Sequence, residues 1–174
     1  MKVLILTRGA PGSGKTTFLS RNGLIRYVVS PDSIRAHLGG VDVDSKGEPQ
    51  IGFFSEDDVW REVKLETRER MEDEEPVIID ATFQVPKHLE MPLKLAIQFR
   101  YKPLILDFTG IPIDVSVTQN ALRKGWERVP EDVIENAYAN FKRYRISGKS
   151  KIETMTPDQF AKSELFSDFK RLLP

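Results

Sequence analysis

The sequence predicts an α/β fold in which a parallel sheet of four or more strands is covered by helices on both faces. Three observations support this prediction. Short apolar segments alternate with amphipathic helical patterns, a glycine-rich loop follows the first apolar segment, and 40% of the 174 residues are hydrophobic. A chain of this size can bury a substantial core without disulfides, and the sequence has no cysteine. We therefore expect residues 1–174 to form a single domain.

Four segments have the length and apolar character of buried strands. They cover residues 2–7, 26–30, 77–80 and 102–108. The first ends shortly before Gly9, and the third follows Pro76. Because helical patterns separate the four segments, we expect the strands to run parallel to one another.

The clearest helix is predicted to begin at Ser55, because Ser55 and Asp58 have the spacing of a capping box. Apolar side chains recur at helical spacing along this segment. They are Trp60, Val63, Thr67 and Met71. The opposite face is charged, and we expect it to be solvated.

A second helix is predicted to begin at Pro130. Proline is favoured in the first turn of a helix, and Glu131 and Asp132 place negative charge where the helix dipole favours it. The apolar stripe of this helix is predicted to contain Val133, Ala137, Phe141 and Tyr144.

Two segments do not fit this alternation. Residues 39–52 contain four glycines, Pro49 and several acidic residues, which predicts a mobile surface loop. After about residue 150 we expect a polar C-terminal linker, or the point at which a longer natural chain was cut. Within this part, Thr156 and Pro157 are predicted to open a short helix.

The strongest motif is the loop Gly-Ala-Pro-Gly-Ser-Gly-Lys-Thr at residues 9–16, which matches G-x-x-x-x-G-K-[ST] between a strand and a helix. Glycines permit the turn, and successive N–H groups and the helix N-terminus attract phosphate. This context predicts a P-loop NTPase fold that binds ATP or another nucleoside triphosphate together with Mg²⁺. The predicted phosphate-binding residues are Gly9, Gly12, Ser13, Gly14, Lys15, Thr16 and Thr17.

Within this loop, Lys15 is predicted to reach the β- and γ-phosphates, and Thr16 is predicted to bind Mg²⁺. Asp80, at the end of the third strand, is the second candidate metal ligand, directly or through a water. A regulatory GTPase would need an Asn-Lys-x-Asp motif, which the sequence lacks, and Asp80 is followed by Ala81 and Thr82 rather than by a glutamate that would activate water. The sequence therefore favours transfer of the γ-phosphate to an acceptor other than water.

The candidate acceptor site follows the second strand. Ser30 can cap a helix, Pro31 suits its first position, and Asp32 and Arg35 are three residues apart on one helical face. In the functional interpretation, Asp32 accepts a proton from an incoming hydroxyl and Arg35 holds an anionic part of the same acceptor. In the structural interpretation, Asp32 complements the helix dipole and pairs with Arg35 for stability.

Residues 119–130 are predicted to form a lid. A helix that ends in cations and a glycine could fold Arg123 onto the transferring phosphates. The alternative is a basic helix C-terminus that satisfies its own carbonyls. Trp126 in this segment could stack on a base, whereas Phe53 and Phe54 could line the acceptor cleft or anchor the preceding loop.

Other residues carry weaker signals. A basic stretch could follow a phosphate backbone or could be solvated surface. It consists of Lys142, Arg143, Arg145, Lys149 and Lys151 around Tyr144. His37 and His88 have no partners at metal-ligand spacing, so we expect ordinary surface or helix residues. Trp60 and Met71 are expected in the core.

Taken together, these motifs resemble those of the 5′-hydroxyl polynucleotide kinases of phage and bacteria. The resemblance runs over roughly residues 2–146. It is carried by ILTRGAPGSGKTT, by D-x-x-R at Asp32 and Arg35, by VIIDAT, by N-x-x-R at Asn120 and Arg123, and by VPEDVIENAY from Val129.

The resemblance implies roles for individual residues. Lys15 and Thr16 would bind the triphosphate and the metal, Asp32 would be the general base, and Arg35 would hold the phosphate 3′ to the acceptor nucleoside. Arg123 would contact the phosphates of ATP, and Thr82 would contact the acceptor phosphate. The sequence departs from the family pattern at Ala81, at Phe83, where an asparagine is usual, and at Gln119, where an arginine is usual.

The resemblance also implies an adenylate-kinase-like topology and ATP-dependent transfer of the γ-phosphate to the 5′-hydroxyl end of RNA or DNA in nucleic-acid repair. Some relatives form homo-oligomers or have a fused or partner phosphatase or ligase. Two alternatives remain open. The chain could be a small-molecule kinase acting on a nucleoside, sugar or antibiotic, or a nucleotide-dependent switch that transfers nothing.

Composition limits the partners. The chain has 26 basic and 26 acidic residues, so a broad electrostatic grip on nucleic acid is disfavoured, although local basic patches remain. The apolar runs are far shorter than the roughly 18 residues of a membrane span. The N-terminal segment turns polar before a signal peptide could form. We therefore expect no membrane partner and a cytoplasmic location, which is the host cytoplasm for a phage-encoded chain.

Overall fold

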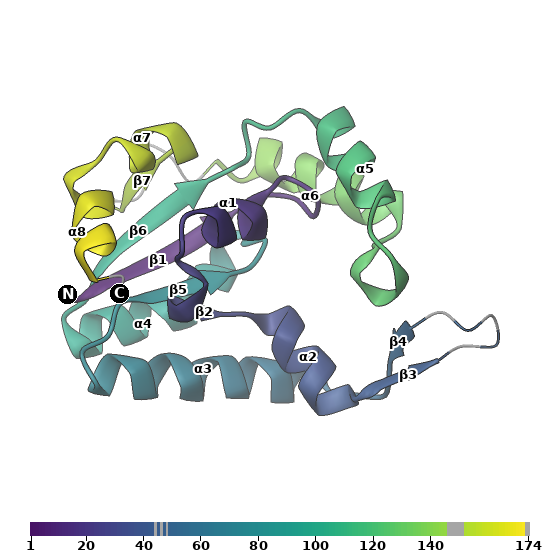
Figure 1. The fold of residues 1–174 in the computed structure, drawn as a ribbon, viewed down its shortest axis with the longest axis horizontal. Helices are drawn as coiled ribbons and strands as arrows, with labels where there is room; N and C mark the ends of the chain where they lie inside the picture. The colour runs from purple at the N-terminus through teal and green to yellow at the C-terminus, as the bar shows by residue number, and fades with distance from the viewer. Residues whose placement is uncertain (44, 46, 48, 146–151, 173–174) are drawn as a thin grey trace.

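The computed structural model describes residues 1–43, 45, 47, 49–145 and 152–172. In this part of the chain, five parallel strands form one sheet in the order β2-β5-β1-β6-β7 (Figure 1). The strands are β1 Val3–Arg8, β2 Val28–Val29, β5 Val77–Asp80, β6 Lys102–Asp107 and β7 Glu153–Met155. The predicted parallel sheet is therefore confirmed.

Two strands differ from the prediction. The second strand contains only Val28 and Val29, because the preceding residues form the 3₁₀ turn η1, Ile25–Tyr27. The fifth strand, β7, was not predicted, since its three residues are partly polar and it pairs only with β6 at the edge of the sheet. No period-2 apolar pattern can form over so short a segment.

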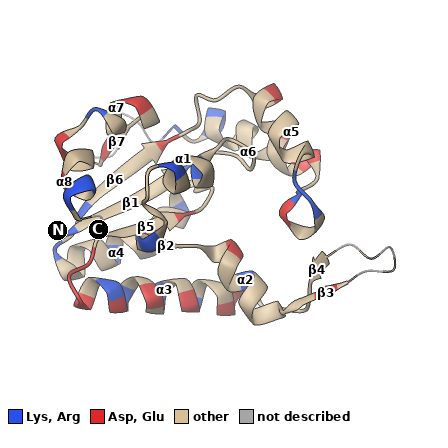
Figure 2. Cartoon of the chain, in the orientation of Figure 1, with Lys and Arg blue, Asp and Glu red and all other residues tan. Residues whose placement is uncertain are grey.

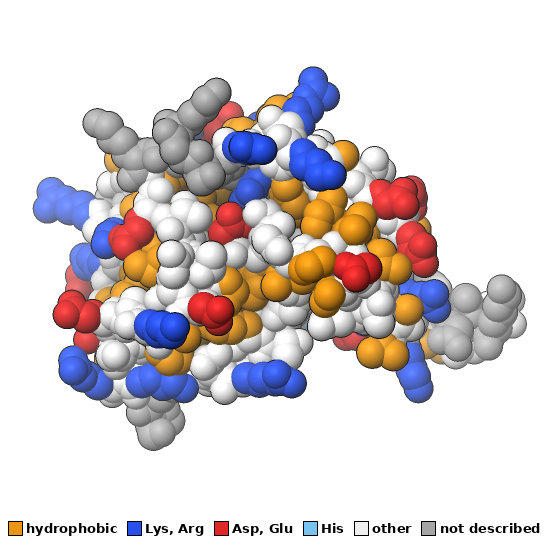
Figure 3. All heavy atoms as spheres, turned by 90° about the horizontal axis from the view of Figure 1, so that it is seen from above, with side chains coloured by type: hydrophobic (Ala, Val, Ile, Leu, Met, Phe, Trp, Pro, Cys, Tyr) orange, Lys and Arg blue, Asp and Glu red, His pale blue; other side chains and the backbone are white. Residues whose placement is uncertain are grey.

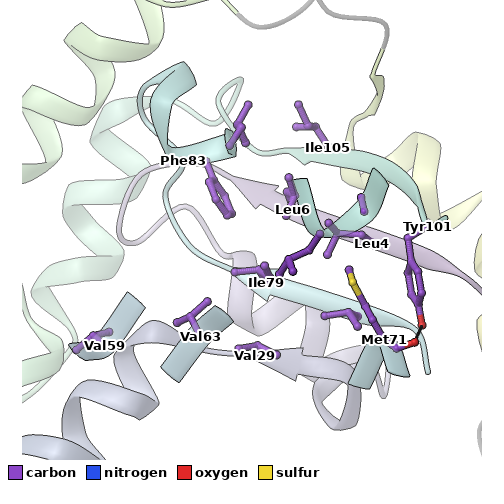
Figure 4. Close-up of a cluster of buried hydrophobic side chains, with 14 residues drawn as sticks. Leu4, Leu6, Val29, Val59, Val63, Met71, Ile79, Phe83, Tyr101 and Ile105 are labelled. Atoms are coloured by element: carbon purple, nitrogen blue, oxygen red, sulfur yellow. Dashed lines mark hydrogen bonds between the residues drawn. The ribbon is translucent and has the colours of Figure 1, made fainter. Parts of the chain in front are cut away.

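Alternating side chains of the strands bury both faces of the sheet. Leu4 and Leu6 of β1 face α3, Glu56–Glu72, and α4, Glu90–Phe99, which follows the 3₁₀ turn η2, Pro86–Leu89 (Figure 4). Val3 and Ile5 face the opposite layer. That layer contains α1 Lys15–Arg21, α7 Pro157–Ala161 and α8 Glu164–Leu172 (Figure 1). Helices cover both faces, as predicted.

Two further helices lie at the carboxyl end of the strands. α5, Ile113–Ala121, packs against α6, Glu131–Arg143. A third apolar cluster joins α6 to Ala10 of the glycine loop. The short 3₁₀ turn η3, Gly125–Glu127, lies between these helices.

The predicted helix faces are correct to within one residue. The buried stripe of α3 begins at Val59 rather than Trp60, and that of α6 contains Ile134 where Val133 was predicted. The predicted capping box at Ser55 is wrong. Ser55 is the N-cap of α3 but makes no side-chain cap bond, and Asp58 instead pairs with Arg61 at 2.8 Å.

The segment 39–52, predicted to be a mobile surface loop, is mostly exposed in its described residues but contains a β-hairpin that was not predicted. It follows α2, Pro31–Gly39, and consists of β3, Val41–Val43, paired antiparallel with β4, Pro49–Ile51. At its base the backbones of Gly39 and Gly52 approach so closely that neither residue has room for a Cβ atom. The glycines therefore make the close strand pairing possible.

The remaining predictions for the chain ends have mixed outcomes. The short helix α7 does begin after Thr156, which forms a capping box with Gln159. Residues 146–151 lie outside the described residues, and the segment 152–172, where a polar linker was predicted, contains β7, α7 and α8. None of the described helices is both long and apolar enough to cross a membrane. The arrangement is the α/β P-loop fold with adenylate-kinase-like topology.

Candidate active site

The glycine loop lies between the end of β1 and the start of α1, and α5 supports it from one side. Gly12 and Gly14 have φ angles of +78° and +87°, which L side chains rarely adopt. A Cβ atom on Gly12 would collide with the backbone carbonyl of Ser116 in α5. Within the described residues, the buried Ser13 hydroxyl has no hydrogen-bond partner. The loop is therefore held closely against α5.

Lys15 is buried beneath this loop. Its Nζ donates hydrogen bonds of 2.9 Å to the carbonyl oxygens of Gly9 and Ala10. Burial lowers the pKa of the Lys15 ammonium to about 8, although the negative charge of Asp80 opposes this shift. The ammonium is therefore held by neutral acceptors, which charged phosphate oxygens can replace.

Asp80, at the end of β5, connects the glycine loop to the centre of the sheet. Its Oδ2 accepts a hydrogen bond of 2.6 Å from the Thr16 hydroxyl, and its Oδ1 accepts one of 2.8 Å from Thr7. A hydroxyl and a carboxylate beside a triphosphate pocket are the oxygen donors that suit Mg²⁺, which takes most of its other ligands from phosphates and water. The residues predicted as metal ligands therefore fit this ion.

Asp32 and Arg35 lie on α2, where they are paired with each other. Arg35 Nη1 lies 2.6 Å from Asp32 Oδ1. The same guanidinium also forms a two-pronged contact with Glu56, the first residue of α3. Acidic and basic residues both occur along α3 (Figure 2). This second partner was not predicted, because the charged face of α3 was expected to be solvated.

Arg123 follows α5, and a buried asparagine closes the segment that carries it. The Asn120 side chain donates to the Val129 carbonyl at 2.7 Å and accepts from the Val129 N–H at 3.1 Å. These two bonds join the ends of the predicted lid. Arg123 Nη1 donates to the Glu127 carbonyl at 3.3 Å, so the guanidinium also satisfies a backbone group of its own segment.

One cavity of about 590 Å³ brings the predicted site residues together. Its walls include Lys15, Thr16, Asp32, Arg35, Asp80, Thr82 and Arg123. A smaller cavity of about 440 Å³ adjoins it and contacts Gly14, Thr16, Thr17 and Arg123. Gly9 of the glycine loop lies beside Thr82, because its N–H donates to the Thr82 carbonyl at 3.3 Å.

Aromatic side chains also line this cavity. Trp126 and Phe54 are among them, whereas the adjacent Phe53 is 96% exposed. Phe54 also packs against the core, so it both lines the cleft and anchors the chain. Trp60 also lines the cavity, so its predicted place in the core is correct only in part. Met71 is in the core, as predicted.

A third cavity, of about 760 Å³, lies next to α2 and shares Thr16, Ser30 and Asp80 with the cavity of about 590 Å³. His37 lines this cavity. Burial lowers the pKa of His88, which lies in η2. Among the described residues, no cluster of three His, Cys, Asp or Glu side chains could hold a metal.

The described residues of the basic stretch, Lys142, Arg143 and Arg145, are exposed at the end of α6 and after it. Arg143 stacks on the ring of Tyr144, with 5.3 Å from its guanidinium carbon to the ring centre. Lys149 and Lys151 lie outside the described residues.

The sequence did not predict three side-chain contacts around this site. Glu56 follows an N-cap and looks like an ordinary first-turn acid, so no local signal indicates its contact with Arg35. Asn120 was noted in the N-x-x-R motif, although its bonds to Val129 could not be predicted. Thr7 lies in a buried strand, and only the sheet register places it opposite Asp80.

Comparisons with known proteins identify a family and similar folds. The chain matches a family described as an AAA domain over residues 4–145. A gluconokinase from Sinorhizobium meliloti 1021 is 14% identical, with a TM-score of 0.53 over 99% of this chain and 98% of that chain. A sugar kinase from Janibacter sp. HTCC2649 is also 14% identical, with a TM-score of 0.57 over 91% and 87% of the two chains.

A third similar structure is a chain of the Pnkp1/Rnl/Hen1 RNA repair complex. It is 21% identical, with a TM-score of 0.61 over 80% of this chain, but only 44% of that chain is covered. No curated protein matches the sequence significantly. At these identities the structural likeness shows the fold alone.

Proposed function

The chain belongs to the AAA_33 family of AAA domains, and from that premise we propose that it is an ATP-dependent kinase that phosphorylates a hydroxyl of a small molecule. The main support for this proposal is that the glycine-loop residues and Asp32 line the same cavity. Lys15 and Thr16 line its triphosphate side, and Asp32 lines its acceptor side. Hydrolysis is disfavoured because Asp80 is followed by Ala81 rather than by a glutamate that would activate water.

In the proposed reaction, the acceptor hydroxyl oxygen forms a bond to the γ-phosphorus while the bond from the γ-phosphorus to the bridging oxygen breaks. The hydroxyl proton passes to the Asp32 carboxylate and then to water, and ADP leaves. Lys15 and Arg123 lie where they can bind the transferring phosphoryl group. Such reactions depend mainly on positioning and on charge stabilisation. Mg²⁺, held by Thr16 and Asp80, would neutralise charge on the β- and γ-phosphates.

The shape of the site favours a small acceptor. Gly125 of η3 packs against Pro49 of β4, so the hairpin and the lid segment meet beside the cavity. A cavity of about 590 Å³ is in the size range of small-molecule sites. Two of the similar structures that match over most of their length are a gluconokinase and a sugar kinase by name.

A polynucleotide 5′-hydroxyl end is the second candidate acceptor. The D-x-x-R pair of Asp32 and Arg35 in the cavity favours it, as does the likeness to a chain of an RNA repair complex. The surface gives it less support. On the face shown in Figure 3, positive and negative side chains are interspersed rather than separated into a basic track.

An acceptor panel tests this proposal. The chain is incubated with Mg²⁺ and γ-labelled ATP, and with neutral sugars, nucleosides, sugar acids, nucleoside 3′-monophosphates and 5′-hydroxyl oligonucleotides in parallel. We expect label to enter a small acceptor with a higher kcat/KM than an oligonucleotide. Faster labelling of the oligonucleotide would support the second candidate. Tight nucleotide binding without any labelled acceptor would overturn the kinase proposal.

A further inference from the structure

Arg35, in the proposed acceptor site, is held by two carboxylates from two helices. Arg35 Nε and Nη2 donate to the two oxygens of Glu56 at 2.7 and 2.8 Å, and Nη1 donates to Asp32 at 2.6 Å. A guanidinium has five N–H donors, so three of them are engaged by these contacts. The Arg35 side chain is 23% exposed, whereas Asp32 and Glu56 are more exposed, at 73% and 55%.

The contact with Glu56 is the stronger of the two by geometry. Two parallel N–H donors meet both carboxylate oxygens, which is the same arrangement that an arginine uses to bind a phosphate. A phosphate on an acceptor would have to displace Glu56 from this edge of the guanidinium or use the two remaining donors. In either position it would lie close to the Glu56 carboxylate.

The charges of this cluster also disfavour an anion. One guanidinium between two carboxylates leaves a formal charge of −1. The hydrogen bond from Arg35 lowers the pKa of Glu56, and partial burial opposes the shift only in part, so Glu56 stays ionised at neutral pH. An incoming phosphate would therefore meet a net negative cluster, whereas a neutral hydroxyl can donate to the carboxylates and accept from the remaining N–H groups.

Resting on the kinase function proposed above, we propose that Glu56 is a specificity-determining residue that occupies Arg35 and thereby selects acceptors without a phosphate near the reacting hydroxyl. Glu56 is not among the residues that line the cavity, so it acts through Arg35. The alternative is that Glu56 only ties α2 to α3, which pack against each other.

A binding experiment separates these roles. The P-loop is first saturated with Mg²⁺ and a non-hydrolysable ATP analogue, and the protein is then titrated with uridine or with uridine 3′-monophosphate. Both tryptophans of the chain line the acceptor cavity, so intrinsic fluorescence reports on this site. The ratio of the two affinities is compared among the wild type, Glu56→Gln, the matched control Asp57→Asn in the same helical turn, and Glu56→Gln combined with Arg35→Gln.

We expect Glu56→Gln to shift the affinity ratio toward the monophosphate by at least about tenfold, because Arg35 gains a free bidentate edge. Asp57→Asn should leave the ratio unchanged, and adding Arg35→Gln should abolish the gain. The proposal is overturned if Glu56→Gln does not bind the monophosphate detectably, if its ratio equals that of the wild type, or if Asp57→Asn produces the same gain.

The affinity ratio is measured without phosphoryl transfer, so this experiment and the acceptor panel can fail separately. An altered affinity ratio without transfer to any acceptor would contradict the kinase function but not the role of Glu56. Transfer to small acceptors with an unaltered ratio would contradict only the role of Glu56. The thermal unfolding midpoint of each variant shows whether loss of the contact between α2 and α3 changes the fold instead.

Discussion

Asp32 is the residue on which the proposed proton transfer depends. Replacing it by asparagine keeps the size of the side chain but removes the base, so we expect kcat to fall by about 10²- to 10⁴-fold with little change in nucleotide affinity. The measurement is steady-state transfer to the best acceptor, together with nucleotide binding by calorimetry. Asp57→Asn is the control, since it removes a nearby exposed carboxylate outside the cavity. Nearly full activity of Asp32→Asn would exclude this base.

Lys15 gives nucleotide binding a specific pH dependence. Its pKa in the free protein is lowered to about 8, mainly by burial, and triphosphate binding should raise it again by adding negative charge. Above pH 8, nucleotide binding must then be accompanied by uptake of a proton by Lys15. The titration of Lys15 should therefore leave the nucleotide affinity unchanged below pH 8 and should lower it as pH rises further.

Calorimetry at pH 9 in buffers of different ionisation enthalpy measures this proton uptake directly. Lys15→Arg is the control, because a guanidinium remains protonated throughout this range. The pH dependence above pH 8 should be absent in that variant. Equal pH dependence in the two proteins would assign the titration to another group.

For individual residues, the sequence located the side chains that carry the proposed chemistry but did not predict their tertiary contacts. The glycine-loop motif has fixed spacing, so Lys15 and Thr16 could be located from the chain alone. The pairing of Arg35 with Glu56 joins residues 21 positions apart, and it depends on how α2 packs on α3. An acidic residue in the first turn of a helix is expected because it complements the helix dipole. Only the tertiary structure shows that Glu56, unlike the neighbouring acidic residues, contacts Arg35.

At the element scale, the close contact between the glycine loop and α5 makes the loop intolerant of a side chain. We expect Gly12→Ala to displace the loop and to reduce nucleotide affinity strongly, because the new Cβ would meet the Ser116 carbonyl at a strained φ. Nucleotide titration measures the effect. The control is Gly110→Ala, since a Cβ there would meet no atom within 4 Å. Equal affinity in the two variants would show that this contact does not position the loop.

The helices α3 and α6 could be predicted because their apolar residues recur at helical spacing, and the central strands could be predicted because each is a short apolar run. The hairpin at β3 and β4 could not, because its pairing depends on the close approach of Gly39 and Gly52 rather than on an alternating pattern. The strand β7 was missed for a related reason. Only three residues pair with β6, and its stability comes from the edge of a sheet that is already formed.

At the scale of the whole molecule, the order of the parallel strands creates the site. The ends of β1, β2 and β5 meet at one edge, so the glycine loop, α2 and Asp80 converge although they are far apart in sequence. This convergence could be predicted from the fold class. The choice of acceptor could not, because it depends on the cavity walls that the hairpin and the segment near Trp126 supply.

Whether Asp32 faces the reacting hydroxyl is tested most directly by a crystal structure of the chain with Mg²⁺, a non-hydrolysable ATP analogue and an acceptor that the panel has identified. We expect the acceptor hydroxyl oxygen within about 2.6–3.2 Å of an Asp32 oxygen and in line with the γ-phosphorus. An acceptor bound in the cavity beside His37, with its hydroxyl away from Asp32, would contradict the account.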